Sequence, residues 1–211
     1  MTKLYSVGIG VGTQNKKGEW LEVFYPAPLL NPDAAIASAL SEALDYSAGN
    51  AVINLDNSSL QSLADALDKQ QQSAQADAVK SLLNSKRSCV ATILASDDEP
   101  GSVPEAYLKL QLISHRLVRP HGINLSGIFG SLPNVAWTNE GAIDLTELPA
   151  RQVAARINGQ NLSVDSVDKF PKMSDYVVPA GVRIADARRV RLGAYIGEGT
   201  TIMHEGFVNF N

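Results

Sequence analysis

The residue best suited to chemistry is a glutamate that interrupts a series of small residues near the end of the chain. From position 181, every sixth residue is small: Gly181, Ala187, Gly193 and Gly199. The next position in this series is Glu205. A carboxylate can take a proton from an amine or carry an acyl group transiently. Positions that break a local pattern are often functional. Glu205 is therefore our candidate catalytic residue, with a solvent-facing glutamate at a corner of the chain as the alternative.

Four arginines precede this glutamate in a protein that is acidic overall. They are Arg183, Arg188, Arg189 and Arg191. Guanidinium groups bind carboxylates through two parallel hydrogen bonds, so the cluster indicates a site for a substrate that carries carboxylates. Salt bridges between neighbouring segments or subunits account for each arginine, taken singly, equally well.

A histidine and two asparagines lie around the candidate glutamate. His204 could hydrogen-bond Glu205 or carry a proton, although a lone histidine is more often structural. Asn209 could contact substrate or, with Asn211, form a stack of amides. We take His204 and Asn209 as further candidate substrate-binding residues, and the sequence leaves any metal ligand unknown.

The first half of the chain offers weaker candidates. Gly8, Gly10 and Gly12 resemble a phosphate-binding loop only superficially, because neither a helix start nor a Gly-Lys-Ser/Thr sequence follows them. Cys89 lies in an apolar, strand-like run, which predicts a buried thiol rather than a nucleophile.

The remaining histidines, His115 and His121, flank the end of a predicted helix beside two arginines. Cations there stabilise a helix C-terminus. A zinc enzyme would need three converging imidazoles, and only His204 lies in the region of the sixfold pattern. We therefore expect no carbonic anhydrase-like zinc site.

Composition and charge narrow the class of protein. The chain has 211 residues, of which 45% are hydrophobic and 19% charged, and its net charge is −4. Such a chain can bury a substantial core, and its charge disfavours nucleic acid as a partner. A single cysteine, no long apolar run and no signal-peptide pattern indicate a cytoplasmic protein without a membrane segment.

Strand and helix patterns alternate through residues 1–120 and predict an N-terminal α/β (α+β) domain. A hairpin is expected at 4–11 and 20–25, a helix capped by Asn31, and a strand at 51–55. Asp56 begins a second helical pattern whose polar middle, 69–75, favours a solvated face or a connection between helices. A strand at 88–95 and a helix at 104–118 complete the domain.

Residues 121–177 form a middle segment rich in glycine and asparagine. We expect short strands and tight loops there, then a helix at 148–157 with Pro149 in its first turn. Residues 169–174 are predicted to be a linker.

The last segment, 178–211, repeats with a period of six. An aliphatic residue leads every hexad: Val178, Ile184, Val190, Ile196, Ile202 and Val208. Neither the helical period nor the strand period accounts for this spacing. Hexapeptide periodicity is typical of a parallel β-helix whose aliphatic residues point into a narrow core, so the first coils of such a helix are expected here.

These hexads, with the sequence MHEGFVNFN at 203–211 above all, resemble the tetrahydrodipicolinate N-succinyltransferases in their longer bacterial form. The resemblance implies a left-handed β-helix, a homotrimer and transfer of succinyl from succinyl-CoA to the amine of hydrated tetrahydrodipicolinate, in lysine and diaminopimelate biosynthesis. It also implies that Glu205 is catalytic, either forming an acyl-anhydride or acting as a general base. No tightly bound cofactor is implied, and a divalent cation on the trimer axis is left open.

Members of that family continue well beyond the length of this chain and complete both the β-helix and the coenzyme A site. We therefore expect the chain to be an incomplete part of the enzyme, with most coenzyme A-binding residues outside it. A non-catalytic module for assembly or regulation is the alternative function. Release of thiol from succinyl-CoA would distinguish the two.

Overall fold

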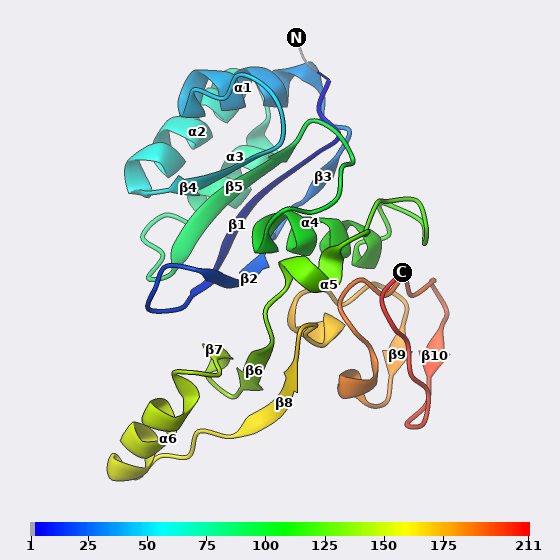
Figure 1. Cartoon of the computed structure of the whole chain (residues 1–211). Coiled ribbons are helices and arrows are strands. Elements are labelled where there is room, and N and C mark those ends of the chain that lie inside the picture. The colour runs from blue at the N-terminus through cyan, green and yellow to red at the C-terminus, as the bar shows by residue number, and fades with distance from the viewer. Residues whose placement is uncertain (1–2) are drawn as a thin grey trace.

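The computed structural model describes residues 3–211, which form a helix-covered sheet, a projecting arm and a tail (Figure 1). The strands are β1 (Ser6–Gln14), β2 (Trp20–Phe24), β3 (Leu29–Leu30), β4 (Ala51–Leu55), β5 (Ser88–Leu94), β6 (Val135–Thr138), β7 (Gly141–Asp144), β8 (Val164–Asp168), β9 (Arg183–Ile184) and β10 (Thr201–Ile202). The α-helices are α1 (Ala34–Leu44), α2 (Asn57–Lys69), α3 (Ser73–Lys80), α4 (Val103–Ser114), α5 (Ile128–Ser131) and α6 (Leu148–Ile157), and 3-10 turns lie at Met173–Asp175 and Ala187–Arg189.

The N-terminal part is built on a five-stranded antiparallel sheet of order β2-β1-β5-β4, in which β3 also pairs with β1. The predicted hairpin is confirmed, since Val11 of β1 pairs with Phe24 of β2. The strands predicted after it are confirmed as β4 and β5. The sheet thus provides the rigid support for everything that follows.

Close packing explains the alternating glycines of β1. A Cβ atom at Gly10 would lie 2.5 Å from the carbonyl oxygen of Phe24 and 2.7 Å from the ring of Tyr25. One at Gly12 would lie 2.1 Å from the carbonyl oxygen of Glu22. These glycines let β2 and the following residues approach β1, and they form a strand rather than a phosphate-binding loop.

Helices cover both faces of the sheet (Figure 1). On one face α1, α2 and α3 pack against buried residues such as Val7, Cys89 and Ile93. On the other face α4 packs against Val23, Val90 and their neighbours. Cys89 is buried, as predicted, and burial raises the pKa of its thiol, which keeps it protonated and unreactive.

Two helix predictions differ from the structure. Asp33, not Asn31, caps α1 by accepting a hydrogen bond from the Ile36 N–H at 3.1 Å, because Asn31 adopts a left-handed φ of 47° in the preceding turn. The long second helix is divided into α2 and α3, and Gln71 between them has a φ of 61°. The polar middle of that pattern is therefore a connection between helices.

An arm, which we define as residues 135–168, projects from the body (Figure 1). Its three strands are antiparallel in the order β7-β6-β8, and α6 lies at the predicted 148–157. The sequence did not indicate β8, because its residues are nearly all exposed and carry no alternating pattern. The expected linker at 169–174 is instead anchored, since Phe170 and Met173 are buried in the main core.

The tail, which we define as residues 178–211, consists of two turns that run side by side. β9 and β10 pair in parallel, with Arg183 opposite Thr201 and Ile184 opposite Ile202. Further along, the Asn211 N–H donates to the Gly193 carbonyl at 3.0 Å. Every one of these partners lies eighteen residues away, which is three hexads.

The tail contains less strand than the β-helix coils expected at 178–211. Strand is confined to the two-residue β9 and β10, and a 3-10 turn lies at Ala187–Arg189. Val178, which was expected to point inward, is 71% exposed. A hexad offers few residues per face, and each coil gains strand pairing only from stacked neighbours. Within residues 3–211 the structure thus establishes a pair of stacked turns but no β-helix.

The C-terminal end of α4 holds the first turn of the tail. Ser114 Oγ donates to the Ala194 carbonyl at 3.1 Å and accepts from the Gly193 N–H at 2.9 Å. Arg116 Nε donates to the Ile196 carbonyl at 2.7 Å. Leu192 beside these contacts is fully buried in the main core. The tail is therefore fixed to the N-terminal part and does not hang free.

Candidate functional site

Glu205 lies in the short turn between β10 and Val208, a turn closed by the Gly206 N–H donating to the Met203 carbonyl at 2.9 Å. Its side chain is 97% exposed, and its carboxylate lies 3.7 Å from Nη2 of Arg189. Glycines at the equivalent positions 181, 193 and 199 adopt left-handed φ values of 72°, 94° and 80°. The structure thus presents this carboxylate to solvent beside a guanidinium group, and the chain does not enclose it.

Arg189 connects the two turns of the tail at this point. Its Nη2 donates to the Glu205 carbonyl oxygen at 3.3 Å. Its Nε is buried and has no hydrogen-bond partner among the described residues. The guanidinium group therefore keeps donor capacity that the fold does not use.

Arg188 forms a local, two-pronged pair with Asp186. Its Nε and Nη2 lie 3.1 and 3.0 Å from the two carboxylate oxygens. Hydrogen bonding to Arg188 lowers the pKa of Asp186. The Arg188 side chain is 73% exposed, so this pair is screened by solvent and can be exchanged for a ligand carboxylate.

Arg191 is more firmly engaged than the other arginines. Its Nη2 donates to Asp168 Oδ2 at 2.7 Å, and its Nη1 donates to Asn209 Oδ1 at 3.1 Å. The guanidinium carbon lies 5.7 Å from the ring centres of both Phe170 and Phe207. The structure therefore joins two of the predicted site residues, Arg191 and Asn209.

Arg183 and His204 lie on exposed positions at either side of this group. Arg183 begins β9, where its backbone N–H donates to the Thr200 carbonyl at 2.9 Å. His204 lies next to Glu205 with an exposed side chain. Neither the histidine nor Arg183 has a hydrogen bond from its side chain among the described residues.

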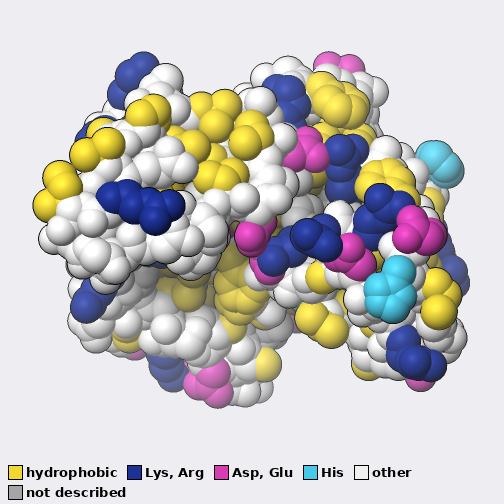
Figure 2. Space-filling view, turned by 90° about the horizontal axis from the view of Figure 1, so that it is seen from below, with side chains coloured by type: hydrophobic (Ala, Val, Ile, Leu, Met, Phe, Trp, Pro, Cys, Tyr) yellow, Lys and Arg dark blue, Asp and Glu magenta, His cyan; other side chains and the backbone are white. Residues whose placement is uncertain are grey.

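A cleft of about 620 Å³ opens between the sheet, the arm and the tail. Aromatic side chains form much of its wall, and Arg188 and Arg191 reach it from the tail, whereas Glu205 lies outside it. Figure 2 shows basic and acidic side chains intermixed along this side of the molecule. The size is that of a small-molecule site.

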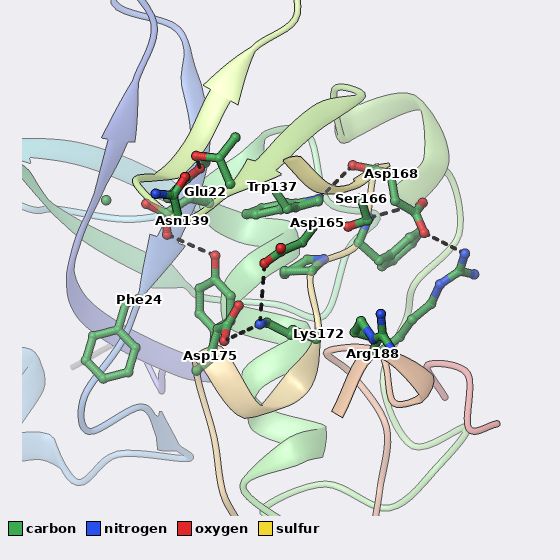
Figure 3. Close-up of a pocket in the computed structure, with 18 of the residues that line it drawn as sticks. Glu22, Phe24, Trp137, Asn139, Asp165, Ser166, Asp168, Lys172, Asp175 and Arg188 are labelled. Atoms are coloured by element: carbon green, nitrogen blue, oxygen red, sulfur yellow. Dashed lines mark hydrogen bonds and ion pairs between the residues drawn. The ribbon is translucent and has the colours of Figure 1, made fainter. Parts of the chain in front are cut away.

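Lys172 lies among carboxylates inside the cleft (Figure 3). Its Nζ is 3.4 Å from Asp175 and 4.0 Å from Asp165. Cations and anions thus alternate over a short distance. This arrangement ties β8 to the segment that leads into the tail.

Glu22 is the most buried charged residue of the cleft, with 7% of its surface exposed. It accepts hydrogen bonds from the hydroxyls of Thr13 at 2.6 Å and Tyr176 at 3.1 Å. Arg87 lies 3.8 Å away. Burial raises the pKa of Glu22 and outweighs these contacts, which act in the opposite direction.

Sequence reasoning missed the carboxylates Glu22 and Asp168, and it also missed Lys172 and Tyr176. None of them belongs to a local motif. Tyr176 lies 154 residues from its partner Glu22, so only the folded chain brings the two together. Asp168 likewise contacts Arg191 across 23 residues, a pairing that no local pattern in the sequence indicates.

The described residues contain no group of three His, Cys, Asp or Glu side chains that could hold a metal ion. His115 is half-buried, and burial lowers the pKa of its imidazole. His121 is engaged at a different place, where its backbone N–H donates to the Asn211 side-chain oxygen Oδ1 at 2.6 Å. None of the helices described between residues 3 and 211 is long and apolar enough to cross a membrane.

Two family models match the chain over most of its length. The model for the N-terminal part of tetrahydrodipicolinate N-succinyltransferase matches residues 32–130, and the model for the middle part matches residues 132–172. Among solved structures, a 2,3,4,5-tetrahydropyridine-2-carboxylate N-succinyltransferase from Campylobacter jejuni superposes with a TM-score of 0.84 at 26% identity. That match covers 100% of this chain and 64% of the other.

Curated relatives carry a matching name. The 2,3,4,5-tetrahydropyridine-2,6-dicarboxylate N-succinyltransferase of Pseudomonas paraeruginosa is 62% identical over 99% of this chain, and that of Vibrio cholerae is 55% identical over 98%. The chain spans 60% of the length of each of these relatives. Sequence, domain models and fold agree, and the chain belongs to the tetrahydrodipicolinate N-succinyltransferase family.

Proposed function

We propose that this chain is part of an acyltransferase that moves succinyl from succinyl-CoA to the amino group of hydrated tetrahydrodipicolinate, in lysine and diaminopimelate biosynthesis. The observation that carries the proposal is 62% identity over 99% of the chain to a relative named for this reaction. The exposed Glu205 beside Arg189 supports it chemically, because a carboxylate accessible to an acyl donor is what the transfer requires.

In the proposed reaction Glu205 attacks the thioester carbonyl. The carbon–sulfur bond breaks, coenzyme A leaves as a thiolate, and a mixed anhydride forms. The substrate amine then attacks the succinyl carbonyl, the amide bond forms, and the Glu205 carboxylate and one proton are released. In the competing description Glu205 takes the proton from the amine while the amine attacks succinyl-CoA directly.

We propose that the arginines of the tail bind the carboxylates of the substrates. The side chains of Arg188 and Arg189 are 73% and 41% exposed, and Arg183 lies exposed at the start of β9. His204 and Asn209, on either side of Glu205, are candidates for hydrogen bonds to substrate. Arg191, in contrast, has its donors engaged within the fold, with Asp168 and Asn209.

We also propose that the two stacked turns of the tail start a left-handed β-helix. The eighteen-residue spacing of their parallel partners supports this, because it equals three hexads. We propose a homotrimer in the complete enzyme. The Glu205 side chain is 97% exposed in this chain, and a reaction at its carboxylate needs the surface of a second subunit to enclose it. Succinyl-CoA acts as co-substrate in the cytoplasm.

Replacement of Glu205 by Gln in the complete enzyme tests the function. Transfer, measured as thiol released from succinyl-CoA in the presence of tetrahydrodipicolinate, is expected to fall at least about a hundredfold with the fold unchanged by circular dichroism. Near-normal turnover would overturn the catalytic role. A mass spectrum of the wild type with succinyl-CoA alone separates the two mechanisms, because only the anhydride route adds succinyl to Glu205.

A further inference from the structure

Arg191 is joined both to the arm and to the segment that carries Glu205. On one side its Nη2 donates to Asp168, the last residue of β8, at 2.7 Å. On the other side its Nη1 donates to Asn209 at 3.1 Å. One guanidinium group thus links the arm to the segment 203–209.

Aromatic rings hold this guanidinium group from two sides. Phe170 follows β8, Phe207 follows Glu205, and both ring centres lie 5.7 Å from the guanidinium carbon. The side chains of Arg191 and Asp168 are only 30% and 32% exposed. A planar cation stacked on rings and paired with a carboxylate has little freedom to turn toward another partner.

The backbone fixes the same segment. The Arg191 N–H donates to the Val208 carbonyl at 3.1 Å, and the Val208 N–H donates to the Arg189 carbonyl at 2.9 Å. Glu205 is only three residues before Val208. Displacement of Arg191 would therefore also displace the turn that presents the carboxylate.

Asp168 is itself held rigidly. Its Oδ1 accepts a hydrogen bond from the Lys169 N–H at 2.7 Å, and its carbonyl accepts one from the indole N–H of Trp137 at 3.0 Å. Trp137 belongs to β6 in the middle of the arm. The arm thus offers the arginine a fixed carboxylate.

We infer that Asp168 and Arg191 form a positioning pair that sets the place of the Glu205 turn, and that Arg191 does not bind substrate. The inference rests on the proposed function of Glu205. The pair would make the function of Glu205 depend on the arm. A change in the position of β8 would move Asp168 and Arg191, and through them the 203–209 segment.

The kinetic test replaces Asp168 by Asn in the complete enzyme, which keeps the shape of the side chain and removes its charge. We expect kcat to fall about tenfold to a hundredfold, the range for small displacements of a reacting group, with KM for both substrates within about twofold of the wild type. Arg191→Lys is expected to behave in the same way. A raised KM for tetrahydrodipicolinate at unchanged kcat in Arg191→Lys would overturn the inference and assign Arg191 to substrate.

The matched control is the second arginine–carboxylate pair of the arm. Arg151 and Glu140 lie 2.8 Å apart with side chains 44% and 40% exposed, and within residues 3–211 their side chains form no ion pair or hydrogen bond with the tail. Arg151→Gln is expected to leave kcat and KM unchanged. An equal loss of kcat in Arg151→Gln and Asp168→Asn would mean that any disturbance of the arm lowers activity, and would overturn the specific role of the pair.

A readout independent of catalysis separates this inference from the proposed function. Hydrogen exchange at the amides of Arg191 and Val208 is expected to accelerate in Asp168→Asn and to stay unchanged in Arg151→Gln. If Glu205→Gln keeps its activity, the proposed function is wrong. The hydrogen-exchange measurement still tests whether Asp168 and Arg191 hold the 203–209 segment in place. Unchanged exchange in Asp168→Asn would overturn the pair even in an active enzyme.

A double-mutant cycle completes the test. If Asp168 acts only through Arg191, the double variant Asp168→Asn/Arg191→Lys loses no more kcat than the more affected single variant. If the fold loss of kcat in the double variant equals the product of the two single-variant losses, the residues act independently, which would contradict the inference.

Discussion

Glu22 makes the buried end of the cleft sensitive to pH. Burial raises its pKa above the ordinary carboxyl value, so the folded chain binds this proton more readily than the unfolded chain does. The free energy of unfolding is therefore expected to fall as pH rises from the ordinary carboxyl pKa through the raised one, and to level off above it. Glu22→Gln removes the charge and should flatten this part of the curve.

Urea unfolding of wild type and Glu22→Gln, at intervals between about pH 4 and pH 8, measures this effect. Glu42→Gln is the control, because the Glu42 carboxylate is exposed and pairs with Lys69 on the surface. Parallel curves for the wild type and Glu22→Gln would contradict the expectation.

At the scale of residues, the sequence pattern identified one kind of candidate site residue and missed another. Glu205 was recognisable because it breaks a series of small residues that the chain repeats every six positions. Asp168 was not, because its partner Arg191 lies 23 residues further along and no periodicity connects them. A side chain that acts through tertiary contact leaves no signal in a single sequence.

At the scale of elements, the structure agrees with the sequence where local chemistry is strong. The strand at 51–55 and the helix at 148–157 have the predicted bounds, since apolar runs and a first-turn proline determine them. β8 and the anchored segment after it were missed, because an exposed edge strand has no alternation and Phe170 finds its core only in the folded chain. The β-helix expected in the tail depends on neighbours that stack on it.

The glycines of β1 lead to a prediction about this sheet. Gly10→Ala would bring a Cβ atom within 2.5 Å of the Phe24 carbonyl, which belongs to the paired strand and cannot move freely. The free energy of unfolding is expected to fall by roughly 1–3 kcal/mol, the usual cost of overpacking. Chemical denaturation measures it.

Gly130→Ala is the matched control for this substitution. A Cβ atom at Gly130 in α5 would meet nothing within 4 Å, and alanine favours the helix slightly over glycine. Gly10→Ala should therefore lower the free energy of unfolding, whereas Gly130→Ala should raise it slightly or leave it unchanged. Equal losses would contradict the packing explanation.

At the scale of the whole molecule, the parts share one hydrophobic core, and specific polar contacts join them at its edges. The arm is tied to the turn between β1 and β2 by Asn15 Nδ2 donating to Asp144 at 2.8 Å. The tail is tied to α4 through Ser114 and Arg116. The tail also packs into the main core through Val190 and Leu192, and loss of a polar contact at its edge is expected to open it locally at a lower free energy than global unfolding.

Ser114→Ala tests whether α4 controls the order of the tail. The substitution leaves the buried Gly193 N–H and Ala194 carbonyl without their shared partner, which costs about 1–3 kcal/mol, or roughly 5- to 150-fold in a local opening equilibrium. Hydrogen exchange is expected to accelerate by that factor at Arg191 and Asn211 while the amides of β5 keep their protection. Ser81→Ala is the control, because Ser81 directly follows α3 and its Oγ donates to the Ala78 carbonyl of that helix at the surface. Equal acceleration in β5 and the tail would mean that the two unfold as one unit, so that the tail that carries Glu205 draws its order from the entire body and not from the end of one helix.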